Sequence, residues 1–285
     1  MIRTNLRYHA PFSVEDACRI LAASESGAVI GGGTVLLPRM TRDERSVLDA
    51  VHVRNLGLSE IEQAGDTVLI GAGVTYTEVL EAREGLVPSL LTTMARGITG
   101  GAQIRNQGTL VGSAAYANPG SDVPAVLVAL DTTLLIQGTR GTREVRAAQF
   151  FRGPFVVDLG PDEIVTQLSI PHAEGASGYA KLKLSESSWP IVTAAAVAAP
   201  STDGGWRYRL AIGGACGVPI PVDLGFLGRD RFELDAETAG QVRQNVQDTL
   251  GELWSDELAP GSYRQQVAGP IALKALAHLD QEMSS

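Results

Sequence analysis

The chain has 285 residues, 44% of them hydrophobic and 19% charged, which is enough for one large domain or two to three small ones. Its net charge of −9 leaves no basic face, so neither a nucleic-acid partner nor binding to an anionic membrane surface is expected. Two cysteines exclude a disulfide scaffold, and the absence of a signal-peptide pattern or of an apolar run of roughly 18 residues predicts a cytoplasmic protein with no membrane span.

The first region, residues 1–57, has the pattern of a β-α-β unit. A helix is expected from Ser13 to Leu21, because Ser13 can cap it and its apolar residues recur at helical spacing. A short apolar strand follows at residues 28–30 and runs into a glycine cluster. Another strand begins at residues 47–48.

The second region, residues 58–172, mixes strands and helices. The patterns predict strands at 67–72, 133–137 and 164–170, and helices at 75–80, 88–98 and 124–130. A polar, glycine-rich segment, residues 100–112, separates the second helix from the third, and no helix is predicted in it. Asp122 can cap the third helix, because it lies just before Pro124, a residue suited to a first helical turn.

The third region, residues 173–285, begins with strands and ends with helices. The predicted strands are 179–184, 191–199 and 206–212, and the predicted helices are 236–250 and 262–279. Consecutive strands followed by helices are typical of an α+β arrangement, in which helices pack on one face of an antiparallel sheet. We therefore expect a three-stranded antiparallel sheet with two helices.

The first glycine cluster directly follows a predicted strand. Gly31, Gly32 and Gly33 let the backbone approach a ligand closely, and their N–H groups can face a pyrophosphate without a cationic side chain; Thr34 adds a hydroxyl. A tight strand-to-helix turn without a ligand is the alternative. A nicotinamide-binding Rossmann site is not supported, because the third glycine of that fingerprint falls at Leu36.

The second glycine cluster spans residues 100–113. Thr109, Gly112 and Ser113 bring hydroxyl and N–H groups into a small space, which suits a long polar ligand with an anionic end. Asp122 could accept hydrogen bonds from ribose or ribityl hydroxyls, a role compatible with capping. No catalytic or metal-binding motif is found, and the four histidines stand apart, so the chemistry is expected to come from a cofactor.

Three segments of the chain resemble one family. Residues 31–40 read GGGTVLLPRM and are similar to its motif G-G-x-[ST]-L-L-P-x-M, and residues 103–113 read QIRNQGTLVGS and are similar to Q-I-R-N-x-G-T-[IL]-G-G-[ND]. Residues 117–125 read ANPGSDVPA and resemble A-D-P-x-x-[DE]-L-P-A. The family is that of the FAD-binding (medium) subunits of molybdenum hydroxylases, which include carbon monoxide dehydrogenase and bacterial xanthine dehydrogenases.

The resemblance implies a fold and a set of FAD contacts. Residues 1–57 and 58–172 would be two FAD-binding subdomains of the vanillyl-alcohol-oxidase-like kind, and residues 173–285 a C-terminal flavoprotein domain. By position, Gly31, Gly32, Gly33 and Thr34 would hold the pyrophosphate with Val35 beside them, and Thr109, Gly112 and Ser113 would line the other side. Asp122 would contact the hydroxyls of FAD. Tyr179 and Lys181 would approach its isoalloxazine ring, although Tyr179 can equally be a packed strand aromatic.

The resemblance also implies a function within a complex. The chain would pass electrons from iron–sulfur clusters through FAD to NAD or another acceptor, with the clusters on a small subunit and molybdopterin on a large subunit. Three departures keep alternatives open: Val111 replaces a usual glycine, Ser113 replaces Asn or Asp, and residues 183–190 lack the usual arginine pair. The alternatives are a stand-alone FAD-dependent oxidoreductase and a scaffold subunit that has lost FAD.

Overall fold

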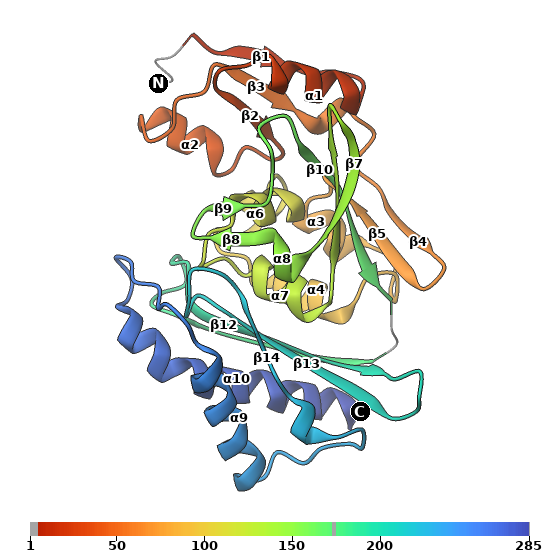
Figure 1. Cartoon of the computed structure of the whole chain (residues 1–285), viewed down its shortest axis with the longest axis vertical. Helices are drawn as coiled ribbons and strands as arrows, with labels where there is room; N and C mark the ends of the chain where they lie inside the picture. Colours follow the sequence, from red (N-terminus) through yellow and green to blue (C-terminus); the bar gives the residue numbers. More distant parts are fainter. Residues whose placement is uncertain (1–4, 173–174, 285) are drawn as a thin grey trace.

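Three sheet-containing layers are stacked along the long axis of the molecule in the computed structural model, which describes residues 5–172 and 175–284 (Figure 1). The layers take successive stretches of the chain, so the first described residues lie in one outer layer and the last in the other. The predicted start of the third region at residue 173 lies outside the described residues. No described helix has the length and apolar character needed to cross a membrane.

The N-terminal layer is a parallel three-stranded sheet with the order β1-β3-β2. Ser13 caps α1 as expected, because its hydroxyl accepts a hydrogen bond from the N–H of Asp16. The strand expected at residues 47–48 begins two positions later. The elements are β1 (Arg7–His9), α1 (Val14–Ala22), β2 (Gly27–Ile30), α2 (Leu36–Thr41), β3 (Asp49–His52) and the 3-10 helix η1 (Val53–Asn55).

The middle layer is an antiparallel five-stranded sheet, β4-β5-β10-β6-β7, with short helices against it. The predicted strands and helices of this region are confirmed, but α5, α6, α8 and several short strands were not predicted. The strands are β4 (Ile61–Ala64), β5 (Thr67–Gly71), β6 (Thr133–Gly138), β7 (Gly141–Arg146), β8 (Phe151–Gly153), β9 (Val156–Val157) and β10 (Ile164–Pro171). The helices are α3 (Tyr76–Glu81), α4 (Ser89–Arg96), α5 (Gly101–Arg105), α6 (Leu110–Tyr116), α7 (Val123–Ala129) and α8 (Ala147–Phe150).

The C-terminal layer has an antiparallel sheet of four strands, β11-β12-β13-β14, so the expected number of three is wrong. The missed strand, β14, is short and contains Pro221, which removes a ladder donor and weakens the strand pattern. The elements are β11 (Ala176–Lys183), β12 (Pro190–Pro200), β13 (Trp206–Gly213), β14 (Ile220–Val222), the 3-10 helix η2 (Gly225–Leu227), α9 (Ala236–Thr249) and α10 (Gly261–Met283).

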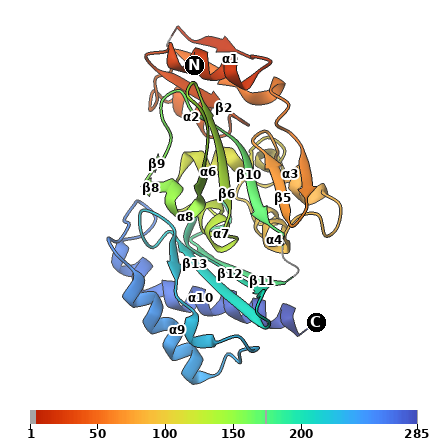
Figure 2. The ribbon, with the colours of Figure 1, turned by 45° about the vertical axis from the view of Figure 1, so that its right-hand side comes forward.

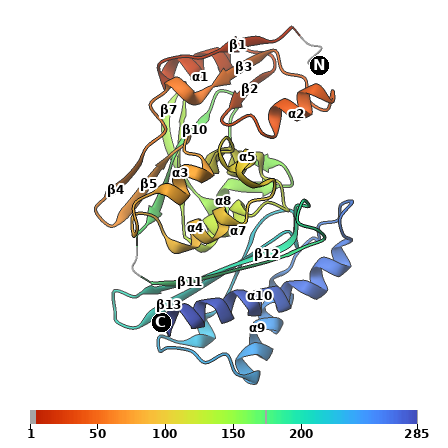
Figure 3. The same ribbon diagram turned by 180° about the vertical axis from the view of Figure 1, so that it is seen from behind.

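Both faces of the C-terminal sheet are covered. Helices α9 and α10 lie on its outer face, and the middle layer lies on its inner face (Figure 3). Strand β12 is buried from Pro190 to Ala199 and is rich in alanine, because its small side chains fit between α10 and the middle layer. At Gly178 a Cβ atom would lie 1.9 Å from the carbonyl oxygen of Ala275, so the helix packs directly on the strand backbone.

Arg264 is the largest fully buried side chain of the described residues. Its guanidinium donates to the carbonyl oxygens of Ala259, Ile191 and Gly214 and pairs with Asp256 at 2.5 Å. These bonds join the start of α10 to β12 and to the turn after β13. Because the guanidinium is fully buried, these acceptors replace the hydrogen bonds that it would make with water.

We expect Arg264→Met to destabilise the C-terminal layer by about 3 kcal/mol, because the carbonyl oxygens of Ile191 and Gly214 lose this buried donor and Asp256 loses its cationic partner. All three tryptophans of the chain, Trp189, Trp206 and Trp254, lie in this layer, so tryptophan fluorescence during urea unfolding reports the loss. The matched control is Arg229→Met, which removes an exposed pair with Asp203 and should change stability by at most about 0.5 kcal/mol. Equal effects of the two substitutions would contradict the role of Arg264.

Candidate cofactor site

A cavity of about 570 Å³ lies between the N-terminal and middle layers. One wall is the turn that follows β2, a second is the first part of α6, and a third is the segment between β9 and the start of β10 (Figure 2). The lining includes eight of the predicted site residues: Gly31, Gly32, Gly33, Thr34, Val35, Thr109, Gly112 and Ser113. The structure therefore brings the two glycine clusters to one site.

The two glycine clusters touch each other directly. A Cβ atom on Gly32 would lie 1.6 Å from the carbonyl oxygen of Gln107, and one on Gly31 would lie 2.7 Å from Oγ1 of Thr109. A Cβ on Gly112 would also meet that hydroxyl, at 2.7 Å. Only glycine permits this approach, and without it the two walls would be pushed apart.

The turn after β2 presents unpaired donors. Within residues 5–172 and 175–284, the N–H groups of Gly32, Gly33 and Thr34 have no hydrogen-bond acceptor. Gly33 has φ of +69°, the left-handed conformation that also occurs in anion-binding turns. Arg39 and Arg45 also line the cavity. Donors and cations together suit an anionic group such as a pyrophosphate, so the residues present fit FAD.

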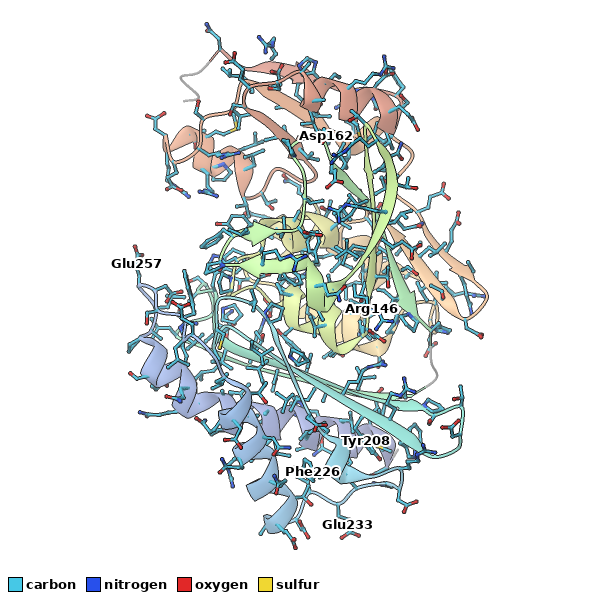
Figure 4. The ribbon with its side chains drawn as sticks, viewed as in Figure 1. Arg146, Asp162, Tyr208, Phe226, Glu233 and Glu257 are labelled. Carbon is cyan, nitrogen blue, oxygen red and sulfur yellow. The ribbon has the colours of Figure 1, made fainter. Side chains whose placement is uncertain are left out.

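The third wall was not predicted from the sequence. It is held by Arg143 of β7, which donates to both carboxylate oxygens of Glu163 at 2.8 and 2.7 Å and to Asp158 at 2.9 Å. Arg143 lowers the pKa of Glu163 through these bonds, so the carboxylate stays ionised at neutral pH. The Oε2 atom of Glu163 also accepts a hydrogen bond from the N–H of Gly160. This bond fixes the turn that lines the cavity. Figure 4 labels Asp162 in this turn, beside the N-terminal layer.

Aromatic side chains lie at one edge of the cavity. Tyr116 and Phe155 both line it, and their ring centroids are 5.2 Å apart. Phe155 is in turn 6.1 Å from Trp254 of the C-terminal layer, and the guanidinium of Arg39 lies 5.7 Å from the Tyr116 ring. This edge therefore offers flat apolar surface beside a cation, which suits an aromatic ring of a ligand.

The other three predicted site residues lie together outside the cavity lining. The carboxylate of Asp122 accepts from the hydroxyl of Tyr179 at 2.5 Å and from Nζ of Lys181 at 2.6 Å. Lys181 also donates to the carbonyl oxygen of Gly97. Burial and the nearby Asp122 charge raise the pKa of Tyr179, so its hydroxyl stays protonated and donates. The expected capping by Asp122 is wrong, because its carboxylate is turned to these partners.

Val111 does not crowd the cavity as its position in the motif suggests. Its side chain is 5% exposed and belongs to the main hydrophobic core of the middle layer, although the residue also contributes to the cavity wall. The replacement of a glycine by valine is therefore accommodated mainly by core packing.

Two glycine turns that line one cavity, beside an aromatic edge and in a chain without a catalytic motif, are typical of a nucleotide-cofactor-binding protein. The family model described as "FAD binding domain in molybdopterin dehydrogenase" matches residues 4–173, and the chain belongs to this family. The resemblance inferred from the motifs is confirmed, and FAD is the cofactor that the family binds. Its relatives are oxidoreductase subunits.

The similarity to known proteins extends over most of the chain. The nicotine 6-hydroxylase medium subunit of Paenarthrobacter nicotinovorans is 30% identical, over 86% of this chain and 90% of that protein. The carbon monoxide dehydrogenase medium chain of Hydrogenophaga pseudoflava is 26% identical over 97% of each. A chain of the reconstituted CO dehydrogenase from Oligotropha carboxidovorans superposes with a TM-score of 0.90 at 25% identity, covering 99% of this chain and 100% of that one.

We expect Gly32→Ala to weaken FAD binding by about five- to a hundredfold, because the added methyl group cannot fit beside Gln107 and overpacking costs about 1–3 kcal/mol. Titration of the flavin-free chain with FAD, followed by the change in flavin fluorescence, measures the loss. Gly240→Ala is the matched control, because a Cβ atom there meets open space on α9. An unchanged affinity of Gly32→Ala for FAD would show that the contact between the two turns does not control FAD binding.

Proposed function

We propose that this chain is the FAD-binding electron-transfer subunit of a molybdenum-containing hydroxylase or dehydrogenase, passing electrons from partner iron–sulfur clusters through FAD to NAD or another acceptor. Its partners are a molybdopterin-binding large subunit and an iron–sulfur small subunit. The observation that carries the proposal is the cavity formed by both glycine motifs. Two cysteines are too few for a four-thiolate cluster, which supports placing the clusters on a partner.

The chain's own residues position the cofactor in this proposal. Gly31, Gly32, Gly33 and Thr34 donate backbone N–H groups to the pyrophosphate, with Val35 beside them. Thr109, Gly112 and Ser113 line the opposite side. Behind that wall lie Asp122, Tyr179 and Lys181, which support it without lining the cavity. The ion pair of Asp122 and Lys181 fixes the start of α7 against β11 and the end of α4.

The three predicted regions fit this arrangement as domains. We infer that residues 1–57 and 58–172 are the two FAD-binding subdomains, of the vanillyl-alcohol-oxidase-like kind, and that residues 173–285 form the C-terminal flavoprotein domain. The support is that the cavity lies between the first two sheets, while the third sheet and its helices form a separate layer.

Purification of the affinity-tagged chain from its native host tests the proposal. We expect equimolar FAD, released by heat and identified by chromatography, together with iron and molybdenum on copurified subunits. The Gly32→Ala variant should lose FAD and retain the metals, because the metals belong to the partners. FAD without the metals would favour a stand-alone flavoenzyme, and metals without FAD would favour a scaffold subunit; either result overturns the proposal.

A further inference from the structure

Tyr76 reaches the cofactor cavity through a single side-chain hydrogen bond. Its hydroxyl donates to Oγ of Ser113 at 2.5 Å, and Ser113 lines the cavity. The tyrosine is the first residue of α3 and is 2% exposed, so its hydroxyl has been withdrawn from water. A buried hydroxyl requires a partner, and in the described chain Ser113 is the one it has.

The tyrosine is held firmly from the other side. Its N–H donates to the carbonyl oxygen of Gly108, and its ring lies so close that a Cβ atom on Gly108 would be 3.2 Å from it. Burial raises the pKa of Tyr76, and the Asp122 carboxylate raises it further, so the phenol remains a donor at physiological pH. Tyr76 is therefore fixed to the second glycine cluster and directs its proton at Ser113.

This contact decides how the hydroxyl of Ser113 is used. A serine inside a helix usually donates to the carbonyl four residues earlier, which here belongs to Thr109. Among the described residues no bond joins that carbonyl to the serine hydroxyl, although its second lone pair could accept one. Because Oγ accepts from Tyr76, its own hydrogen is free to point into the cavity.

The result makes this position a hydrogen-bond donor. The family motif carries Asn or Asp here; an ionised Asp can only accept hydrogen bonds, whereas an Asn amide, like this serine, can donate one. We propose that Tyr76 is a positioning residue that orients the Ser113 hydroxyl as a hydrogen-bond donor to an oxygen atom of bound FAD. The inference rests on FAD occupying the cavity. It adds one residue, Tyr76, that is not among the predicted site residues and does not line the cavity.

A double-substitution cycle on the full chain tests this inference. FAD affinity is measured by fluorescence titration of flavin-free wild type, Ser113→Ala, Tyr76→Phe and the double variant. We expect Ser113→Ala to weaken binding about five- to tenfold, as for the loss of one hydrogen bond. Tyr76→Phe should weaken it by a similar factor, because the released hydroxyl turns to Thr109. The double variant should bind as Ser113→Ala does.

The cycle separates positioning from a general loss of stability. If Tyr76 acts only through packing, Tyr76→Phe weakens binding by the same factor whether or not Ser113 is present, and the proposal is overturned. Unchanged affinity in either single variant also overturns it, while leaving FAD binding itself intact. A wild-type chain that binds no FAD would overturn both the cofactor site and this inference.

The matched control is Tyr208→Phe, far from the cavity in the C-terminal layer (Figure 4). The hydroxyl of Tyr208 donates to the carbonyl oxygen of Asp230, so this variant also loses one tyrosyl hydrogen bond. Its FAD affinity should equal that of wild type. A loss in Tyr208→Phe as large as in Tyr76→Phe would make the effect of Tyr76 nonspecific and overturn the proposal.

Discussion

The close approach of two glycine turns is the constraint on which the cofactor site depends. Gly31 and Gly32 lie against Gln107 and Thr109 at distances that leave no room for a side chain. The first turn belongs to the N-terminal sheet and the second to the middle layer, so one contact sets both the spacing of the layers and the width of the cavity. Substituting either glycine therefore affects domain packing and cofactor binding together.

The site obtains much of its polarity from the backbone. The N–H groups of the turn after β2 that lack acceptors among the described residues belong to residues that line the cavity, and nearby carboxylates are paired with cations, Glu163 with Arg143 and Asp122, behind the lining, with Lys181. Pairing these carboxylates inside the walls keeps negative charge from opposing an anionic cofactor. A chain with a net charge of −9 can thus bind an anionic ligand through local arrangement.

Sequence patterns predicted the parts of this protein that depend on local chemistry. The cap at Ser13, the apolar strands and the glycine clusters each reflect neighbouring residues, and both clusters lie at the cavity. The third wall was missed because it depends on Arg143 pairing with Glu163 across a sheet, which no local pattern encodes. Asp122 was misread as a cap for a related reason, since Tyr179 and Lys181 come from a strand more than fifty residues away.

The same long-range bonds connect the cofactor site to the C-terminal layer. Asp122 lies at the start of α7, whereas Tyr179 and Lys181 lie on β11, so this buried cluster ties the middle layer to the sheet beneath it. That sheet is itself well anchored, because alanine-rich β12 is packed on both faces and Arg264 joins the start of α10 to β12 and to the turn after β13. This packed base supports the middle layer, which carries both Tyr76 and Ser113. The C-terminal layer therefore braces the cavity wall from behind, although both glycine turns lie in the other two layers.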